Sequence, residues 1–289
     1  MRRTVTLLCL LLAGCTQQGA PVFHDQVLAF GTVIDITIDG VEPALAEEFT
    51  AELEQLFLGW HRDWHAWEPG LLTRTNALLA SGEPFTADPA VLPLIIEANR
   101  LSRQSDGLFN PLIGRLLDLW GFQGRPLAEG TLPDPDAIAA WLAQAPVAGD
   151  IHVDGNRISS RNPLAAYDFG GIAKGYAIDR SLEYLRRRGI DNAIINTGGD
   201  LRAIGRRSDR PWRIGIRHPR EDGILASIET DGDDSVFTSG DYERLFSVKD
   251  VRYHHILDPR TGYPAGGTAA VTVVDDSAAR ADAAATALF

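Results

Sequence analysis

The chain has 289 residues, of which 45% are hydrophobic and 23% are charged, so it can bury a sizeable core as one large globular body. This composition excludes the disordered and fibrous classes. Acidic residues outnumber basic residues by 39 to 27, and the net charge of −12 leaves no general basic field for DNA or RNA, so no nucleic acid is expected as a partner. All basic residues except Lys174 and Lys249 are arginines, which favours forked contacts with a small anionic ligand.

The first fifteen residues have the pattern of an export signal. Arg2 and Arg3 precede an apolar run over 5–13, which is shorter than the roughly 20 residues of a spanning helix. Small residues stand directly before Cys15, and this resembles a bacterial lipobox, in which the signal is cut before the cysteine and that cysteine is lipidated. The alternative is an ordinary signal in which Cys15 is incidental.

A lipobox at this place divides the chain into three parts. We expect a lipoprotein signal over 1–14, a lipid-anchored tether over 15–28 and a single folded body over 29–289. The body would face the bacterial periplasm and be anchored to a membrane, with the inner membrane favoured. Cys9 would leave with the signal and Cys15 would carry the lipid, so the mature chain is expected to have no disulfide and no cysteine-based metal site.

Hydrophobic periodicity predicts the elements of the first half of the body. Residues 32–38 alternate, with three isoleucines on one side, as in a strand with one buried face. Apolar residues at spacings of three and four predict a long helix over 45–60, and a second apolar helix is expected over 88–105. Asp134 followed by Pro135 is typical of the start of a third helix.

The second half is richer in strands. Residues 151–159 have a hairpin pattern around Asp154-Gly155, because Asp-Gly suits a tight primed turn. A helix is expected over 172–188, and a last one starts at Ser277. Further strands are expected over 193–196, 212–216, 226–229 and 270–274. Helices and strands are interspersed without a regular βαβ alternation, which favours an α+β fold over a doubly wound sheet.

Three glycine-containing loops bring the backbone within reach of a ligand. Gly170 and Gly171 start a predicted helix, where backbone N–H groups and the helix dipole attract an anion and Lys174 adds positive charge. The loops over 196–200 and 239–242 are similar polar turns. A simple turn explains each about as well, but three together favour an extended ligand with many polar groups. Neither a GxxxxGK(S/T) loop nor a GxGxxG strand-to-helix motif is present, which disfavours the familiar nucleotide folds.

Asp282 and Thr286 are four residues apart on the last predicted helix and therefore share one face. A carboxylate and a hydroxyl, together with backbone carbonyls and ligand phosphates, suit Mg²⁺, which seldom has a complete cage of protein ligands. The alternative is a solvent-facing aspartate beside a threonine that bonds back along the helix.

The segment 254–262 places histidine beside a rigid turn that contains proline and glycine. A loop histidine is a candidate general base near neutral pH, and adjacent strand residues point to opposite faces, so at most one of His254 and His255 is expected in the site. The alternative is a pair of surface histidines ahead of a turn. A serine hydrolase is disfavoured because no GxSxG elbow is present, and a zinc site on His61 and His65 lacks a third ligand.

Six segments resemble, in the same order, the motifs of the ApbE family, the FAD:protein FMN transferases. They are residues 30–32, 105–111 leading to 119–122, 168–176, 196–200, 255–262 and 281–286. The resemblance runs from about residue 29 to the end of the chain. It implies an α+β, ApbE-like body related to the tunnelling fold, which binds FAD in a cleft with Mg²⁺ on the FAD pyrophosphate. It also implies an enzyme that transfers FMN from FAD to a Thr or Ser hydroxyl of a membrane or periplasmic redox protein and releases AMP.

The same resemblance assigns roles to particular residues of this chain. His255 is the implied catalytic residue. The implied Mg²⁺ site comprises the side chains of Asp282 and Thr286 and a backbone carbonyl at Gly171, with Ala285 nearby. The implied flavin contacts are Phe30, Ala66, Trp67, Glu68, Asn110, Lys174, Ile256 and Leu257.

Three flavin positions depart from the pattern of the family. Phe30 stands where methionine is usual, Asn110 where aspartate is common, and residues 65–67 where a Ser-Thr-aromatic sequence is typical. The pattern also continues beyond Phe289, so further residues are expected to complete the fold. These departures motivate an alternative function, a non-catalytic periplasmic protein that binds or delivers FAD. The metal pair and the histidine argue against it, because a carrier needs neither a metal nor a base.

Overall fold

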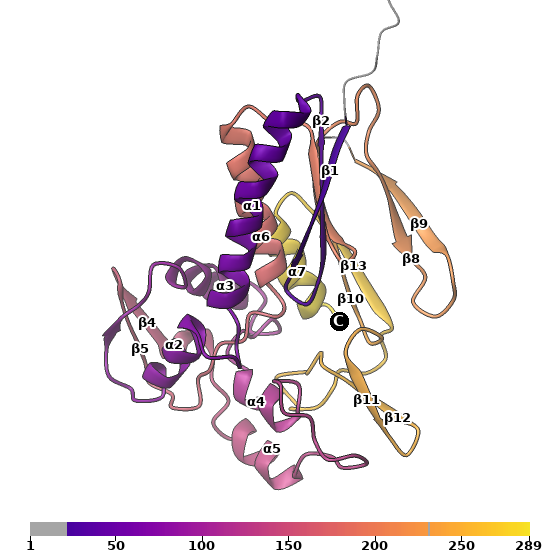
Figure 1. Cartoon of the computed structure of the whole chain (residues 1–289). Helices are drawn as coiled ribbons and strands as arrows, with labels where there is room; N and C mark the ends of the chain where they lie inside the picture. Colours follow the sequence, from indigo (N-terminus) through magenta and orange to yellow (C-terminus); the bar gives the residue numbers. More distant parts are fainter. Residues whose placement is uncertain (1–21, 231) are drawn as a thin grey trace, which may run out of the picture.

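A six-stranded antiparallel sheet runs through the upper half of the molecule (Figure 1). The structure, a computed structural model, describes residues 22–230 and 232–289. In their order across the sheet, the strands are β1 (Val22–Ala29), β2 (Thr32–Asp39), β6 (Ala193–Thr197), β7 (Asp200–Gly205), β10 (Gly232–Gly240) and β13 (Ala270–Asp275). All neighbouring strands in this sheet are antiparallel.

Helices pack on one face of this sheet, and a separate hairpin packs on the other. The helices are α1 (Pro43–Asp63), α6 (Ala173–Arg187) and α7 (Ala278–Ala287), and the hairpin consists of β8 (Arg213–Arg217) and β9 (Ile224–Glu229). The apolar stripe predicted for α1 is buried from Phe49 onward, with Leu53 and Phe57 fully covered in the main core, whereas its first residue, Leu45, is exposed. On the other face, Ile214 of the hairpin packs with Leu201 and Val236. Helices and antiparallel strands therefore form the predicted α+β fold.

The lower half carries the remaining elements. They are α2 (Leu71–Leu79), β3 (Phe85–Thr86), α3 (Leu92–Gln104), α4 (Gly114–Leu119), α5 (Pro135–Leu142), the 3₁₀ turn η1 (Ala148–Asp150), β4 (Ile151–Asp154), β5 (Arg157–Ser160), β11 (Leu245–Val248) and β12 (Val251–His254). A second apolar cluster joins α4 and α5 to the loop that follows β12, through Trp120, Trp141 and Leu257. The Trp120 indole N–H also donates to the Gly262 carbonyl at 2.8 Å, so this loop is fixed on a packed base.

The structure differs from the sequence predictions at three element boundaries. The expected tether over 15–28 overlaps β1, which begins at Val22 and pairs along its whole length with β2, so the folded body starts earlier than residue 29. The helix expected from residue 88 begins at Leu92, because Asp88 caps a turn by accepting the Ala90 N–H at 2.9 Å. The turn of the predicted hairpin is residues 155–156, since Asp154 still pairs in the strand.

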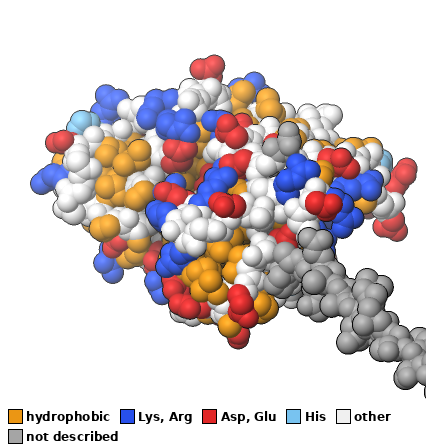
Figure 2. Space-filling view, turned by 90° about the horizontal axis from the view of Figure 1, so that it is seen from above, with side chains coloured by type: hydrophobic (Ala, Val, Ile, Leu, Met, Phe, Trp, Pro, Cys, Tyr) orange, Lys and Arg blue, Asp and Glu red, His pale blue; other side chains and the backbone are white. Residues whose placement is uncertain are grey.

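The predicted signal and Cys15 lie outside the described residues. Within residues 22–230 and 232–289, no helix has both the length and the apolar character needed to cross a bilayer. On the face shown in Figure 2, basic and acidic side chains are interspersed rather than gathered by sign. Several of the arginines are ion-paired, such as Arg186 with Asp233 and Arg188 with Glu52.

Helices α6 and α7 cross at a glycine, which brings the start of α6 close to α7. A Cβ on Gly175 would lie 2.2 Å from the Ala278 carbonyl oxygen, so only glycine permits this contact. Asp179 of α6 then caps α7, because its carboxylate accepts the backbone N–H groups of Ala278 at 2.9 Å and Ala279 at 3.0 Å. The predicted cap also forms, with the Ser277 hydroxyl accepting the N–H of residue 280.

We expect Asp179→Ala to lower the free energy of unfolding by about 2–4 kcal/mol, because it leaves two N–H groups of α7 and the half-buried Arg202 guanidinium without their shared acceptor. Urea unfolding measures the change. Asp276→Ala is the matched control, since Asp276 is exposed and pairs only at the surface with Arg280, and it should change the same quantity by less than about 0.5 kcal/mol. Equal losses in both variants would contradict the capping role of Asp179.

Candidate active site

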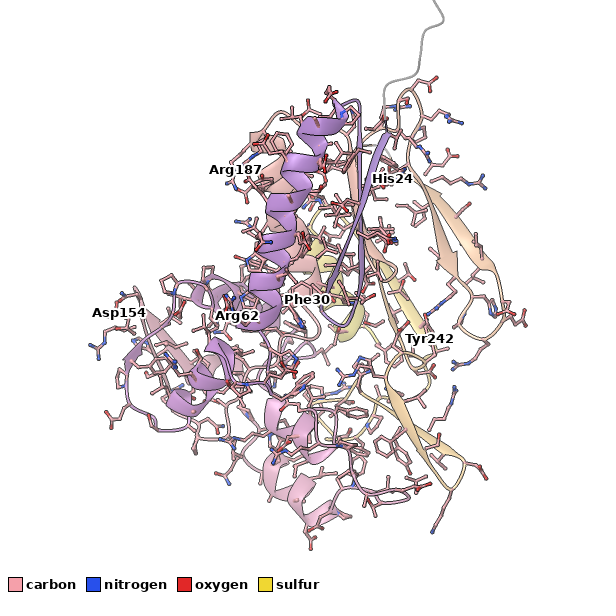
Figure 3. The ribbon with its side chains drawn as sticks, viewed as in Figure 1. His24, Phe30, Arg62, Asp154, Arg187 and Tyr242 are labelled. Atoms are coloured by element: carbon pink, nitrogen blue, oxygen red, sulfur yellow. The ribbon has the colours of Figure 1, made fainter. Side chains whose placement is uncertain are left out.

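A cavity of about 870 Å³ lies where the sheet, the helices and the lower half meet. Its wall is built from the β1–β2 turn, the end of α1, the start of α6, the β6–β7 turn, the segment after β10, the loop after β12 and one face of α7. In Figure 3, Phe30 at the β1–β2 turn and Tyr242 after β10 mark two of its sides. This volume lies in the range of small-molecule and cofactor sites.

Phe30 holds an unusual backbone conformation at the rim of this cavity. Phe30 and Gly31 have φ values of 53° and 73°, a left-handed pair that a bulky residue rarely adopts. The Phe30 N–H donates to Nδ1 of His61 at 3.2 Å, and the Phe30 ring stacks on Trp64 with 6.2 Å between ring centroids. These contacts hold an aromatic side chain where the family usually has methionine.

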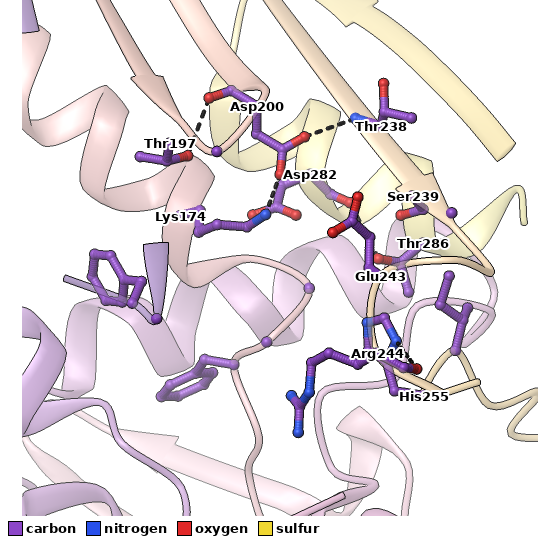
Figure 4. Close-up of a pocket in the computed structure, with 18 of the residues that line it drawn as sticks. Lys174, Thr197, Asp200, Thr238, Ser239, Glu243, Arg244, His255, Asp282 and Thr286 are labelled. Carbon is purple, nitrogen blue, oxygen red and sulfur yellow. Dashed lines mark hydrogen bonds and ion pairs between the residues drawn. The ribbon is translucent and has the colours of Figure 1, made fainter. Parts of the chain in front are cut away.

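The start of α6 and the β6–β7 turn bring Lys174 and Asp200 together. Their side chains form an ion pair, and the second carboxylate oxygen of Asp200 accepts the Thr238 N–H at 2.8 Å (Figure 4). Burial alone would lower the pKa of Lys174, but the carboxylates of Asp200 and Asp282 outweigh it and raise that pKa. The ammonium therefore stays charged beside the glycine-rich start of α6.

Asp282 and Thr286 both line the cavity from one face of α7, as their spacing predicts. Asp282 Oδ2 accepts the Gly175 N–H at 3.0 Å, and the Thr286 hydroxyl donates to the Asp282 carbonyl at 3.3 Å. A Cβ on Gly171 would lie 2.8 Å from the Thr286 hydroxyl oxygen, so the backbone at Gly171 lies directly against this hydroxyl. Asp282 is only 6% exposed, which excludes the solvent-facing alternative, although the threonine does bond back along the helix.

These donors fit Mg²⁺. Burial raises the pKa of Asp282, while the Lys174 ammonium opposes the shift, so this carboxylate would gain from a cation. Asp282, the Thr286 hydroxyl and the Gly171 carbonyl are hard oxygen donors in one part of the cavity wall, and only glycine lets the backbone at 171 come this close to Thr286. Within the described part of the chain, no group of three or more His, Cys, Asp or Glu side chains could hold a metal. Ligand phosphates and water would have to complete the coordination.

His255 follows β12 and lines the cavity. Its backbone N–H donates to the Arg244 carbonyl at 3.0 Å, and its ring Nδ1 lies 3.2 Å from the same oxygen. A carbonyl oxygen only accepts, so Nδ1 carries the hydrogen and Nε2 keeps its lone pair. Burial, reinforced by the Arg244 guanidinium, lowers the pKa of His255 to about 4. The ring is therefore a neutral acceptor at neutral pH.

His254 points away from the cavity, as expected for the neighbouring residue on a strand. It is 6% exposed, and its Nε2 lies 2.9 Å from the Ala265 carbonyl. Its ring packs against Phe289 with 5.4 Å between centroids. The prediction that only one of the two histidines joins the site is confirmed.

We expect His255 to titrate near pH 4, rather than near its ordinary value of 6.5, because burial disfavours the imidazolium form. An unfolded chain takes up this proton at about 6.5, so the contribution of His255 to stability is complete above that pH and is lost as the pH falls toward 4. An NMR titration of the imidazole C–H signals, assigned with His255→Asn, measures the midpoint. A midpoint near 6.5 would show a solvated ring.

Most of the predicted flavin contacts line the cavity, but two predicted site residues do not. Phe30, Ala66, Trp67, Asn110, Lys174, Ile256 and Leu257 are in its wall. Glu68 is exposed outside the wall, because its N–H donates to Nδ1 of His65 and its side chain turns to the surface. Ala285 packs into the core at 1% exposure, because it faces away from the side of α7 that Asp282 and Thr286 share.

Asn110 lines the cavity with its amide already engaged. Its Nδ2 donates to the Pro146 carbonyl at 2.8 Å, and its Oδ1 accepts the Leu112 N–H at 3.0 Å. A flavin contact at this position would therefore use the Asn110 backbone, or it would have to replace one of these two hydrogen bonds of the side chain. An aspartate at this position could accept the Leu112 N–H in the same way but could not donate to the Pro146 carbonyl.

Several cavity residues were not among the predicted site residues. They are His61, Trp64, Asp168, Asp200, Tyr242, Glu243 and Arg244. Asp168 and Asp200 stand beside glycine pairs in the segments that the sequence singled out, so they had a local signal. Arg244 had none, because only the pairing of β11 with β12 brings it back to His255.

The ApbE family model matches residues 30–289, and the six motifs that suggested it meet around this one cavity. The chain belongs to the ApbE family. Among relatives of this ApbE protein, the FAD:protein FMN transferase of Rhodobacter capsulatus is 38% identical over 93% of this chain, and that of Vibrio cholerae is 34% identical over 97%. This chain spans about half (51%) of the length of the first relative and 84% of the second.

Solved ApbE structures share the fold. The crystal structure of the ApbE protein from Thermotoga maritima matches with a TM-score of 0.83 and 32% identity, covering 92% of this chain and 86% of that chain. The flavin transferase ApbE from Vibrio cholerae matches with a TM-score of 0.80 and 30% identity, covering 93% and 86%. The architecture derived from the strand order is therefore that of the family.

Proposed function

We propose that this ApbE protein transfers FMN from FAD to a Thr or Ser hydroxyl of a target redox protein, with Mg²⁺ present and AMP released. The observation that carries the proposal is the meeting of two groups in one cavity. One is a neutral histidine, His255, whose Nδ1–H is held by a carbonyl. The other is the ion pair of Lys174 with Asp200, with Asp282 of α7 in the same cavity wall. Relatives at up to 38% identity bear the name FAD:protein FMN transferase.

The chemistry of the transfer assigns a task to each of these groups. The acceptor hydroxyl oxygen forms a bond to the phosphorus of the FMN half, while the bond from that phosphorus to the bridging oxygen breaks and the bridging oxygen leaves with AMP. His255 Nε2 takes the hydroxyl proton. Lys174 and the N–H groups at the start of α6 hold phosphate oxygens. Asp282, Thr286 and the Gly171 carbonyl would hold Mg²⁺, which when bound offsets charge on the pyrophosphate and on AMP.

An assay with purified protein, FAD, Mg²⁺ and candidate acceptor proteins tests the proposal. We expect flavin fluorescence that stays with the acceptor after denaturation, together with one AMP for each flavin attached. Release of intact FAD only, with no AMP across several acceptors, would instead support the FAD-carrier alternative.

We also infer that Cys15 carries a lipid and holds the folded body on the periplasmic side of a membrane. The basic start, the short apolar run and the small residues before Cys15 support this. Residues 16–21 alone separate Cys15 from β1, so the body would stay close to the anchor. Fatty-acid labelling of the parent and of Cys15→Ala tests the inference, because only the parent should take up label.

A further inference from the structure

Three long cationic side chains line the cavity, and they differ in their partners. Lys174 pairs with Asp200, and Arg217 pairs with Glu243 at 2.8 Å. Arg244 has no carboxylate within ion-pair distance in residues 22–230 and 232–289. A cation that lines a ligand cavity without an internal counter-ion is suited to an anionic group of the ligand.

The side chain of Arg244 is nevertheless held in place. Its Nη2 donates to the Phe122 carbonyl, and its guanidinium carbon lies 5.5 Å from the centroid of the Trp67 ring. Trp67 is itself fixed, because it packs against His65 at 4.5 Å between ring centroids and against a glycine, Gly124, where a Cβ would lie 2.6 Å from the indole. The guanidinium is thus positioned in advance, with most of its N–H donors left for a ligand.

Arg244 also lies directly beside the proposed base. Its carbonyl accepts both the His255 N–H at 3.0 Å and the His255 ring Nδ1–H at 3.2 Å. The Phe122 ring packs edge-on against the His255 ring at 6.3 Å between centroids, and the Phe122 carbonyl accepts from the Arg244 guanidinium, so one residue contacts both side chains. In Figure 4 the Arg244 guanidinium extends into the cavity on the side away from Lys174, Asp200 and Asp282.

We propose that the Arg244 guanidinium binds the phosphate of the FMN half of FAD, the phosphate that is transferred. This rests on the proposed function. A base must reach the attacking hydroxyl within hydrogen-bond distance, and that hydroxyl must touch the FMN phosphorus. The guanidinium of the residue whose carbonyl holds His255 is therefore well placed to reach this phosphate. The forked N–H donors match two phosphate oxygens, and the positive charge stabilises the negative charge on them during transfer.

A comparison of FMN binding with riboflavin binding tests the contact between Arg244 and the phosphate, because the two ligands differ only by that phosphate. We expect Arg244→Gln to weaken FMN binding, relative to riboflavin binding, by about tenfold or more, as measured by flavin fluorescence titration. Arg244→Lys should recover part of the difference, because it keeps the charge and loses the fork. Arg252→Gln is the matched control, since Arg252 lies on the same hairpin, pairs at 3.6 Å with Asp241 and does not line the cavity. It should leave the FMN-to-riboflavin ratio unchanged.

Three results would overturn the assignment. Equal loss of both ligands in Arg244→Gln would mean that Arg244 supports the cavity wall through Trp67. Unchanged binding of both ligands with a raised KM for the acceptor would mean that Arg244 contacts the acceptor protein. If the parent binds neither of these flavins nor FAD, the proposed function fails as well. If the parent binds both and the ratio does not move, only the role of Arg244 fails.

Discussion

We expect His255→Ala to slow FMN transfer by about 100-fold or more while FAD binding is retained. The imidazole is neutral at neutral pH, and the Arg244 carbonyl fixes its tautomer so that Nε2 can accept a proton. The negative charge of a bound pyrophosphate would raise the pKa of His255 from about 4 toward the pH at which a base is most effective. Covalent flavin on the acceptor, measured at saturating FAD and Mg²⁺, gives the rate.

His255→Asn is the sharper version of this experiment. An asparagine amide can still donate to the Arg244 carbonyl, so it keeps the hydrogen bond of Nδ1 and removes only the basic nitrogen. We expect the same loss as in His255→Ala. A rate close to that of the parent in His255→Asn would show that the imidazole only supports the loop after β12. His152→Ala controls for the loss of a histidine away from the cavity, since His152 of β4 is exposed and is not part of the cavity wall.

Elements with local signals in the sequence were predicted well. Helix α7 combines a serine cap with an alanine-rich run, and α1 has a long apolar stripe, so both could be placed without tertiary information. Strand β10 was missed although it lies inside the main sheet. Its first residues are polar, and Asp233 is accommodated there only because Arg202 and Arg186 reach it from β7 and α6. No local pattern could show such a partner.

The residues of the candidate site also fall into two groups, those that a local sequence pattern could place and those that only the fold brings together. Asp282 and Thr286 are one helical turn apart, so spacing alone puts them on one face, and the structure places both in the cavity wall. Asp200 meets Lys174 only because the β6–β7 turn returns to the start of α6. The helix crossing at Gly175 then brings Asp282 to the same place, since a larger residue would push α7 away. Site residues whose positions depend on such crossings cannot be predicted from the sequence alone, because the three-dimensional fold is needed to place them.

We expect Asp282→Asn to raise the Mg²⁺ concentration needed for half-maximal transfer by at least about tenfold, because it removes the one carboxylate among the proposed metal donors. The fold should survive, since the asparagine amide oxygen can still accept the Gly175 N–H that Asp282 Oδ2 accepts at 3.0 Å. Thr286→Val should act in the same direction but less, because a neutral hydroxyl contributes less than a carboxylate to a hard cation. The measurement is a titration of Mg²⁺ against transfer rate, with unfolding curves recorded for each variant.

Asp276→Asn is the control for charge in this titration. Asp276 lies just before α7, is exposed and does not line the cavity, so its loss removes one negative charge from the same part of the chain without touching the proposed site. Its Mg²⁺ requirement should match that of the parent. If Asp282→Asn also keeps the Mg²⁺ dependence and the rate of the parent, the metal assignment is wrong, and the buried carboxylate serves only to join α7 to the Gly175 N–H of α6.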